Sequence, residues 1–226
     1  MHQQKSKKIF IYFFLLIILA SINNFNLREL NIFKIVNIKI SGLNNQENTN
    51  LIKKIQKLDL RNILFLNQKK IETIIDKNTF IENYNIRKKY PSTLYVEIQK
   101  TKFLAKLNYN GKIHLIGTNG RLTGSTYSNE DLPFIFGKPN INDFLKFKEI
   151  IDLSKFSYDQ VVNLYFFPSE RWDLMLQNDI LIKLPKYQVK SALNDVFEML
   201  NDQNFKDIKI FDVRVKNQII LNERRI

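Results

Sequence analysis

A continuous apolar segment near the N-terminus is the strongest pattern in the sequence. Residues 9–22 read IFIYFFLLIILASI and contain no charged residue. An α-helix rises about 1.5 Å per residue, so this run covers roughly 21 Å, less than the roughly 30 Å of a bilayer's hydrocarbon core. Extension to residue 27 and the reach of lysine side chains before the run would make up the difference. We therefore predict a transmembrane helix over residues 9–27, whose anchor residues include Ile9, Phe13, Leu16, Leu19 and Ile22.

Two other interpretations of this segment are open. A cleaved signal peptide has an apolar region of about 7–15 residues and an A-x-A-like cleavage site. Only Ala20 and Ser21 are small here, and Leu19 would stand three residues before a cut after Ser21. A buried core helix would show a polar face, which the run lacks. Both alternatives fit the sequence less well than an uncleaved anchor.

The charges that flank the apolar run set its orientation. Lys5, Lys7 and Lys8 precede it, and cytoplasmic flanks of membrane helices carry the excess of lysine. We therefore predict a cytoplasmic tail over residues 1–8, the helix over 9–27, a linker over 28–32, and a body outside the cytoplasmic membrane. The chain would be a single-pass type II protein of the cell inner membrane, with its C-terminal body in the periplasm.

The body begins with a strand and two helices. From Phe33 the pattern FKIVNIKISGL alternates apolar and polar residues, which predicts a strand that ends at Gly42. Asn48 or Thr49 can cap the helix that follows. The apolar residues at helical spacing are Leu51, Ile52, Ile55 and Leu58 in the first helix, and Ile71, Ile74 and Ile75 in the second.

Two strands should complete this first domain. Residues 81–90 and 93–100 read as strands joined at Tyr90-Pro91-Ser92, where the proline favours a turn. The order β-α-α-β-β is compatible with helices packed on one face of a three-stranded sheet. It is also the order of a POTRA domain, which we predict over residues 33–101.

The rest of the chain, residues 102–226, predicts a second, β-rich domain. Alternating apolar residues flank Asn178-Asp179, which predicts a tight hairpin with a two-residue turn. An amphipathic helix should follow over residues 186–203, because its apolar residues recur at i, i+3, i+4 and i+7. Two strands, at 208–215 and 218–221, should end the domain.

Several motifs, in order along the chain, resemble the FtsQ/DivIB family of bacterial cell-division proteins. A Leu-Phe step leads into a helix within NILFLNQKKIETIID, and the run from Arg87 to Val96 resembles the family's Arg-x-x-Pro-x-x-Leu-x-Val with one extra residue before the proline. Further similar segments are LPFIFG at 132–137, RWDLMLQNDILIKL at 171–184 and the Asp-Val-Arg step at 212–214. The chain departs from the family in having TFI at 79–81 for Pro-Trp-Val, and KTKFLA at 100–105 for Glu-Arg-x-Pro-Val-Ala.

The resemblance implies an α+β fold class: an N-terminal transmembrane helix, a POTRA domain, then a β-rich mixed domain with an amphipathic helix. It implies a non-enzymatic scaffold of the divisome that acts in septum assembly through periplasmic contacts. Its partners would be FtsB-like and FtsL-like proteins and other divisome membrane proteins. In the family a terminal edge strand binds FtsB; the matching residues are Asp212, Val213, Arg214, Val215, Lys216 and Asn217. Arg214 would suit a carboxylate of the partner, although these residues could equally just complete the sheet.

A second interpretation is a POTRA-containing envelope protein in outer-membrane protein assembly or secretion. Proteins of that kind carry tandem repeats of the domain, and this sequence holds a single β-α-α-β-β unit. An envelope enzyme is a third class, and it would need an activated nucleophile or a carboxylate pair in a cleft. Neither is visible in the sequence.

Composition narrows the chemistry further. The formal net charge is +13, but its lysines are spread singly among isoleucine and asparagine, so we expect the lipid bilayer rather than nucleic acid as a partner. There is no cysteine, and the two histidines, His2 and His114, do not suggest a catalytic pair or metal site. Glu130-Asp131 reads as a solvated loop. We expect no cofactor.

One basic run has two interpretations. Arg87-Lys88-Lys89 lies at the end of a predicted strand. It is either a solvated strand edge or a contact for anionic lipid head groups or an acidic partner.

Overall fold

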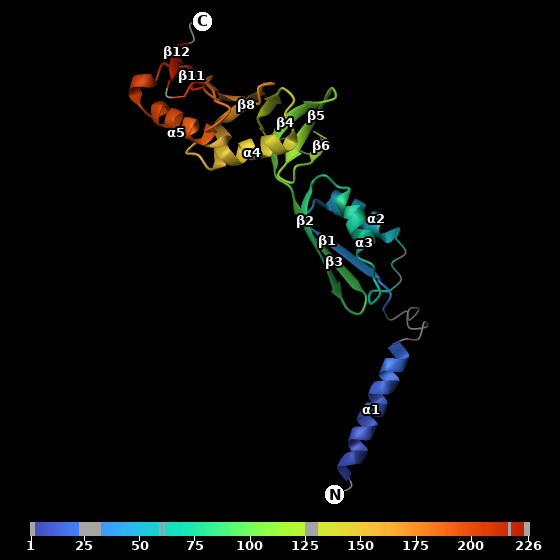
Figure 1. Cartoon of the computed structure of the whole chain (residues 1–226). Helices are drawn as coiled ribbons and strands as arrows, with labels where there is room; N and C mark the ends of the chain where they lie inside the picture. Colours follow the sequence, from blue (N-terminus) through green and yellow to red (C-terminus); the bar gives the residue numbers. More distant parts are fainter. Residues whose placement is uncertain are drawn as a thin grey trace. The chain divides into compact units, whose positions relative to one another are not determined.

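The computed structural model describes residues 3–22, 33–58, 60, 62–124, 131–216 and 218–223. The chain divides into two compact units, Met1–Lys100 and Thr101–Ile226, which Figure 1 colours from blue to green and from green to red.

Helix α1 spans Gln3–Ile22. The apolar side chains from Ile9 to Leu19 are all exposed, and the predicted anchor residues Ile9, Phe13, Leu16 and Leu19 are 61–69% exposed. The side chain of Ile22, and residues 23–27 of the predicted span, lie outside the described residues. Within the described part of the chain, no helix has both the length and the hydropathy of a membrane-spanning helix.

The rest of the first unit is a three-stranded sheet covered by two helices. Its elements are β1 (Asn37–Ser41), α2 (Asn45–Gln56), α3 (Lys69–Asp76), β2 (Ile81–Lys89) and β3 (Thr93–Lys100). The sheet order is β1-β3-β2, in which β3 runs parallel to β1 and antiparallel to β2. The predicted order β-α-α-β-β is thereby confirmed, and Figure 1 shows both helices on the same side of the sheet.

The core of this sheet unit forms between the helices and the sheet. Apolar residues three or four positions apart on α2 and α3 pack against every second residue of β3, as the periodicity predicts. The buried members are Leu51, Ile55, Ile71, Ile75, Ile81, Leu94, Val96 and Ile98.

The helix α2 begins earlier than predicted. Its N-cap is Asn44, whose side chain accepts from the Glu47 N–H at 2.7 Å while the Glu47 carboxylate accepts from the Asn44 N–H at 3.4 Å. This reciprocal capping box satisfies two N–H groups that the helix itself leaves unbonded. The proposed caps Asn48 and Thr49 are therefore wrong, and both residues lie inside the helix.

The second unit is built on one nine-stranded mixed sheet with the order β12-β11-β10-β9-β8-β7-β4-β5-β6. Its strands are β4 (Phe103–Tyr109), β5 (Lys112–Gly117), β6 (Leu122–Gly124), β7 (Phe134–Phe136), β8 (Val161–Phe166), β9 (Trp172–Leu176), β10 (Leu181–Lys183), β11 (Ile210–Asp212) and β12 (Ile220–Asn222). Its helices are α4 (Ile141–Asp152) and α5 (Val189–Leu200), with short 3₁₀ turns at Tyr158–Gln160 and Gln203–Phe205.

Helices α4 and α5 cover one face of this sheet, as Figure 1 shows. A cross-strand row of buried residues lies beneath them, namely Ile135, Leu164, Leu174, Ile182 and Phe211. Apolar residues of α4 and α5, including Phe144, Phe147, Leu193 and Val196, pack into the same core. Every second residue along these strands is apolar, so the face of the sheet beneath the helices can be buried.

Two predictions in this unit need correction. The hairpin between β9 and β10 exists, but its loop has three residues, Gln177, Asn178 and Asp179, closed by a bond from the Leu176 N–H to the Ile180 carbonyl at 2.9 Å. Asp179 has φ +61°, the left-handed residue that a three-residue loop requires. The amphipathic helix begins at Val189 rather than residue 186, because Gln188 itself has φ +60°.

Candidate partner-binding site

The C-terminal edge of the nine-stranded sheet is the candidate partner-binding site. Strand β12 pairs antiparallel with β11 and stands last in the sheet order of the described residues. Ile220 is 51% exposed, whereas Leu221 packs against the core opposite Phe211. An edge strand leaves alternate N–H and C=O groups unpaired within its own sheet, so it can pair with a strand of another chain.

The direction of the backbone groups of β12 follows from the ladder. The Asn222 carbonyl accepts from the Lys209 N–H at 3.1 Å, so Asn222 faces the preceding strand. Backbone groups of successive residues in a strand point to opposite sides. Leu221 therefore directs its N–H and C=O toward the open edge, while its side chain stays on the core.

Of the six residues predicted as the edge contact, the five that the structure describes do not lie in the edge strand β12. Asp212 ends β11, an inner strand between β10 and β12, and the buried Val213 donates its N–H to the Lys183 carbonyl at 3.0 Å. Arg214, Val215 and Lys216 follow in a turn, and Asn217 lies outside the described residues. The edge strand comes later because the Gln218 N–H bonds back to the Val215 carbonyl at 3.2 Å and the chain reverses.

Residues Ile220–Asn222, which form the edge strand β12, are therefore not among the predicted contact residues. The apolar segment at 218–221 does predict the last strand of the chain. Periodicity does not predict the order of strands in the sheet, because the neighbours of a strand are set by tertiary pairing and not by its own pattern.

Arg214 is already engaged within the chain. Its Nε and Nη2 donate to the two carboxylate oxygens of Asp212 at 2.7 and 2.5 Å, a bidentate pair. The hydrogen bond from Arg214 lowers the pKa of Asp212, and the same bond raises the pKa of Arg214. The guanidinium that the sequence offered to a partner's carboxylate thus holds the end of β11 in place, and its side chain is 41% exposed.

A row of charged side chains crosses the sheet beside this pair. The register aligns Asp173 of β9 with Lys183 of β10, and Lys183 with Asp212 of β11. Asp173 is buried, and this desolvation raises its pKa although Arg171 lies 3.3 Å away and opposes the shift. The pKa values of the two carboxyl groups therefore shift in opposite directions: burial raises that of Asp173, and the hydrogen bond from Arg214 lowers that of Asp212.

A groove lies next to the turn that precedes β12. It has a volume of about 720 Å³ and lies between residues 185–195 on one side and residues 213–216, 218 and 219 on the other. Tyr187 and Val215 on its rim are 74% and 54% exposed. The groove gives the edge a neighbouring surface that a partner's side chains can reach.

The residues screened for catalysis lie elsewhere. His114 is half-buried on β5, with Nδ1 3.0 Å from the Lys112 carbonyl oxygen and its ring 6.0 Å from that of Tyr109 in a T-shaped contact. Asp131 is exposed, whereas Glu130 and His2 lie outside the described residues. No group of three or more metal-ligating side chains was found among the residues that the structure describes.

Two family models match consecutive parts of the chain. Residues 33–100 match the POTRA domain, FtsQ-type, and residues 105–214 match the model of the cell division protein FtsQ/DivIB, C-terminal. Together with the fold, these matches define a POTRA-containing protein with a second, family-specific β domain. The chain belongs to the FtsQ/DivIB family.

Curated relatives point the same way. The cell division protein FtsQ of Rickettsia bellii is 24% identical over 206 residues, covering 84% of this chain and 73% of the relative. FtsQ of Rhizobium meliloti is 20% identical over 190 residues, covering 82% and 62%. The extracytoplasmic domain of the cell division protein DivIB from Geobacillus stearothermophilus matches 47% of this chain and 96% of its own, with 11% identity and a TM-score of 0.35. The relatives indicate a cell division protein, which favours the first sequence interpretation over secretion or outer-membrane assembly.

Proposed function

We propose that this chain is a non-catalytic divisome scaffold of the inner membrane that recruits an FtsB-like partner, itself paired with an FtsL-like protein, by strand addition to β12. Residues 1–8 form a cytoplasmic tail, 9–27 the anchor and 28–32 a linker. The POTRA domain at 33–101 and the β domain at 102–226 then lie in the periplasm at the division septum. The observation that carries this proposal is the open edge of β12 in a chain of the FtsQ/DivIB family.

The anchor is supported by the surface of α1. From Ile9 to Leu19 its large apolar side chains are all exposed, which in water would leave an unusually large apolar surface uncovered. A bilayer removes that surface from water, and the lysines before it favour a cytoplasmic N-terminus.

The chain lacks cysteine, so a single introduced cysteine tests the topology. Lys112→Cys places a thiol at the exposed first residue of β5, directly after the turn that follows β4. We expect a membrane-impermeant maleimide to label this variant in cells whose outer membrane has been opened and whose inner membrane is intact. Labelling only after the inner membrane is lysed would place the body in the cytosol and end the proposal.

Strand addition is tested at Leu221, whose N–H faces the open edge. Leu221→Pro removes that donor, and proline is tolerated on an edge strand where the N–H faces solvent. Leu221→Ala is the matched control, because it loses the same side-chain packing and keeps the N–H. The assay is binding of the full chain in detergent to the purified FtsB-like protein of the same bacterium, with folding checked by the fluorescence of Trp172.

The two variants should separate clearly. Losing one intermolecular hydrogen bond and leaving its acceptor unpaired costs about 2 kcal/mol, roughly thirty-fold in Kd. We expect that loss for Leu221→Pro and less than a few-fold for Leu221→Ala. Equal affinity of the two variants would show that the β12 backbone does not bind the partner. Loss of binding with Arg214→Ala and not with Leu221→Pro would move the contact to the turn residues of the original prediction.

A further inference from the structure

Four exposed apolar side chains gather at one end of the first unit's sheet. Val36, Leu64, Phe65 and Tyr90 are 67%, 43%, 51% and 57% exposed. Between Phe33 and Lys100, they are the large apolar side chains that the described residues expose most. Single exposed apolar residues are ordinary, but a group at one place marks a surface that contacts something less polar than water.

The backbone brings these four residues together. The Val36 N–H donates to the Ser92 carbonyl at 3.0 Å, which ties the start of β1 to the turn that holds Tyr90. The Ile63 N–H donates to the Phe33 carbonyl at 2.9 Å, which places Leu64 and Phe65 beside the same strand start. Figure 1 shows the turn between β2 and β3 at the end of the sheet where β1 begins.

Lysines surround this apolar group. Lys34 and Lys89 are exposed and Lys88 is half-buried, and the register pairs Lys89 and Asn37 with the same residue of β3. The Lys89 ammonium lies 5.7 Å from the centre of the Tyr95 ring, and Lys39 approaches that ring at the same distance. Arg87 forms an ion pair with Glu97. We call the set Lys34, Val36, Leu64, Phe65, Lys88, Lys89 and Tyr90 the docking end.

The docking end is also the part of the unit closest along the chain to α1. Eleven peptide units separate Ile22 from Phe33, a span of at most about 40 Å when extended. The opposite end of the sheet, where β3 finishes at Lys100, is followed along the chain by the second unit. A chain anchored through α1 therefore keeps the docking end within reach of the bilayer surface.

We propose that the docking end binds the membrane interface, with Phe65 and Tyr90 at the level of the lipid head groups and Lys88 and Lys89 on anionic phospholipid. The proposal rests on the membrane anchor proposed above. Aromatic side chains favour the interfacial region, and lysines close to an anionic surface are attracted to it. It gives Lys88 and Lys89 one specific role and fixes which face of the first unit is closed to protein partners.

The test places a fluorescent label in the full chain reconstituted into lipid nanodiscs. Ser92→Cys puts the label at the docking end, and Ser41→Cys puts it at the far end of β1 in the same sheet. The discs contain phosphatidylcholine alone or mixed with phosphatidylglycerol, together with a lipid whose head group carries a nitroxide quencher. We expect quenching of the Ser92→Cys label, stronger with phosphatidylglycerol, and little quenching of the Ser41→Cys label.

Charge variants then identify the lipid. Lys88→Glu with Lys89→Glu should lower the ratio of docked to undocked chain by about thirty-fold, equivalent to about 2 kcal/mol. Lys77→Glu with Lys100→Glu makes the same charge change at the opposite end of the sheet, on two exposed lysines, and should leave the ratio unchanged. Phe65→Ser with Tyr90→Ser should weaken quenching in both kinds of disc.

The outcomes separate this inference from the function on which it rests. A chain that does not enter nanodiscs overturns both the anchor and the docking. A chain that enters them while the Ser92→Cys label stays unquenched overturns the docking alone. Equal quenching of the Ser92→Cys label with and without phosphatidylglycerol rejects anionic lipid as the ligand. Shielding of the Ser92→Cys label only by an added acidic protein assigns the docking end to a protein partner instead.

Discussion

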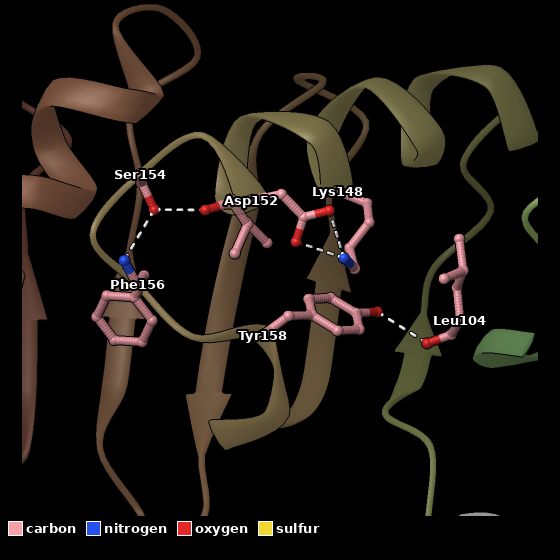
Figure 2. Close-up of polar contacts among 7 residues, drawn as sticks. Leu104, Lys148, Asp152, Ser154, Phe156 and Tyr158 are labelled. Carbon is pink, nitrogen blue, oxygen red and sulfur yellow. Dashed lines mark hydrogen bonds and ion pairs between the residues drawn. The ribbon is translucent and has the colours of Figure 1, made fainter. Parts of the chain in front are cut away.

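Replacing Tyr158 by phenylalanine removes a single buried hydrogen bond from the second unit. The Tyr158 hydroxyl donates to the Leu104 carbonyl at 3.0 Å, as Figure 2 shows. Leu104 sits at an irregularity of β4, where the register against β5 passes from Phe103 to Ala105. The tyrosine thus bonds a carbonyl group at a break in the ladder, which burial would otherwise leave short of partners.

The surroundings keep this hydroxyl protonated. Burial, and after it the Asp152 carboxylate, raises the pKa of Tyr158 far above its ordinary value, so it remains a donor throughout the accessible pH range. Lys148 lies 4.3 Å from the centre of the tyrosine ring and binds both oxygens of Asp152 at 2.5 and 2.6 Å (Figure 2). The phenylalanine ring keeps the cation contact, so the substitution isolates the hydroxyl.

The expected loss is about 1–2 kcal/mol of unfolding free energy, because a buried acceptor is left without its donor. For a unit of this size, that corresponds to a fall of roughly 4–8 °C in Tm. The single tryptophan supplies the assay. Trp172 is 6% exposed and its ring stacks on Phe147 at 4.6 Å, so its fluorescence in a urea titration follows the second unit alone.

The control is Tyr109→Phe, which removes a hydroxyl from a side chain that is 52% exposed. It should change the unfolding free energy by less than about 0.5 kcal/mol. If Tyr158→Phe unfolds at the same urea concentration as the control and with the same slope, the bond to Leu104 contributes nothing. The account of the break in β4 would then be wrong.

Two further predictions use the same fluorescence measurement. Gly137→Ala should lower the unfolding free energy by more than about 3 kcal/mol, because Gly137 has φ +100° and an added Cβ would lie 2.3 Å from a backbone carbonyl oxygen. Gly111→Ala should lower it by only about 1–2 kcal/mol, because Gly111 has φ +78° but open space around the added Cβ. Equal losses for the two variants would contradict this reasoning. Arg214 lowers the pKa of Asp212, so the stability that this carboxylate contributes is present above about pH 4 and is lost as pH falls through its lowered pKa. Asp212→Asn should therefore destabilise at pH 7 and differ little from the parent in acid. Burial raises the pKa of Asp173, so ionisation of this carboxyl group lowers the unfolding free energy as pH rises. Asp173→Asn should therefore make the decrease in unfolding free energy with rising pH smaller. An equal loss of unfolding free energy at every pH would contradict this direction.

Local patterns predicted the elements of the first unit well because each strand and helix carries its own periodicity. Strand alternation at Ile38 and Ile40 and the helical spacing of Ile71 and Ile75 both identify the buried side that the core uses. The pairing of β2 with β3 is a hairpin between sequence neighbours, which a turn signal can reveal. The start of α2 was misplaced because Asn44 and Glu47 cap it together, a pattern that a single capping residue does not reveal.

The second unit was harder because its sheet depends on pairing between distant segments. Helix α4 was missed although Phe144, Phe147 and Ile151 have helical spacing and Asn140 accepts from the Asn142 N–H as its cap. The parallel pairs β4 with β7 and β10 with β11 join segments that no local turn connects. For the same reason the sequence did not show which strand forms the sheet edge, because Asp212 lies in β11, whose outer neighbour β12 is known only once the sheet is assembled.

The edge proposed to bind a partner depends on the crossover through α5. Strand β11 pairs in parallel with β10 through a connection that contains α5, and β12 pairs with β11. A protein that attaches to this last strand consequently selects chains whose whole second unit is assembled. Immature or damaged copies present no such strand, so they would be left out of the complex without any separate inspection step.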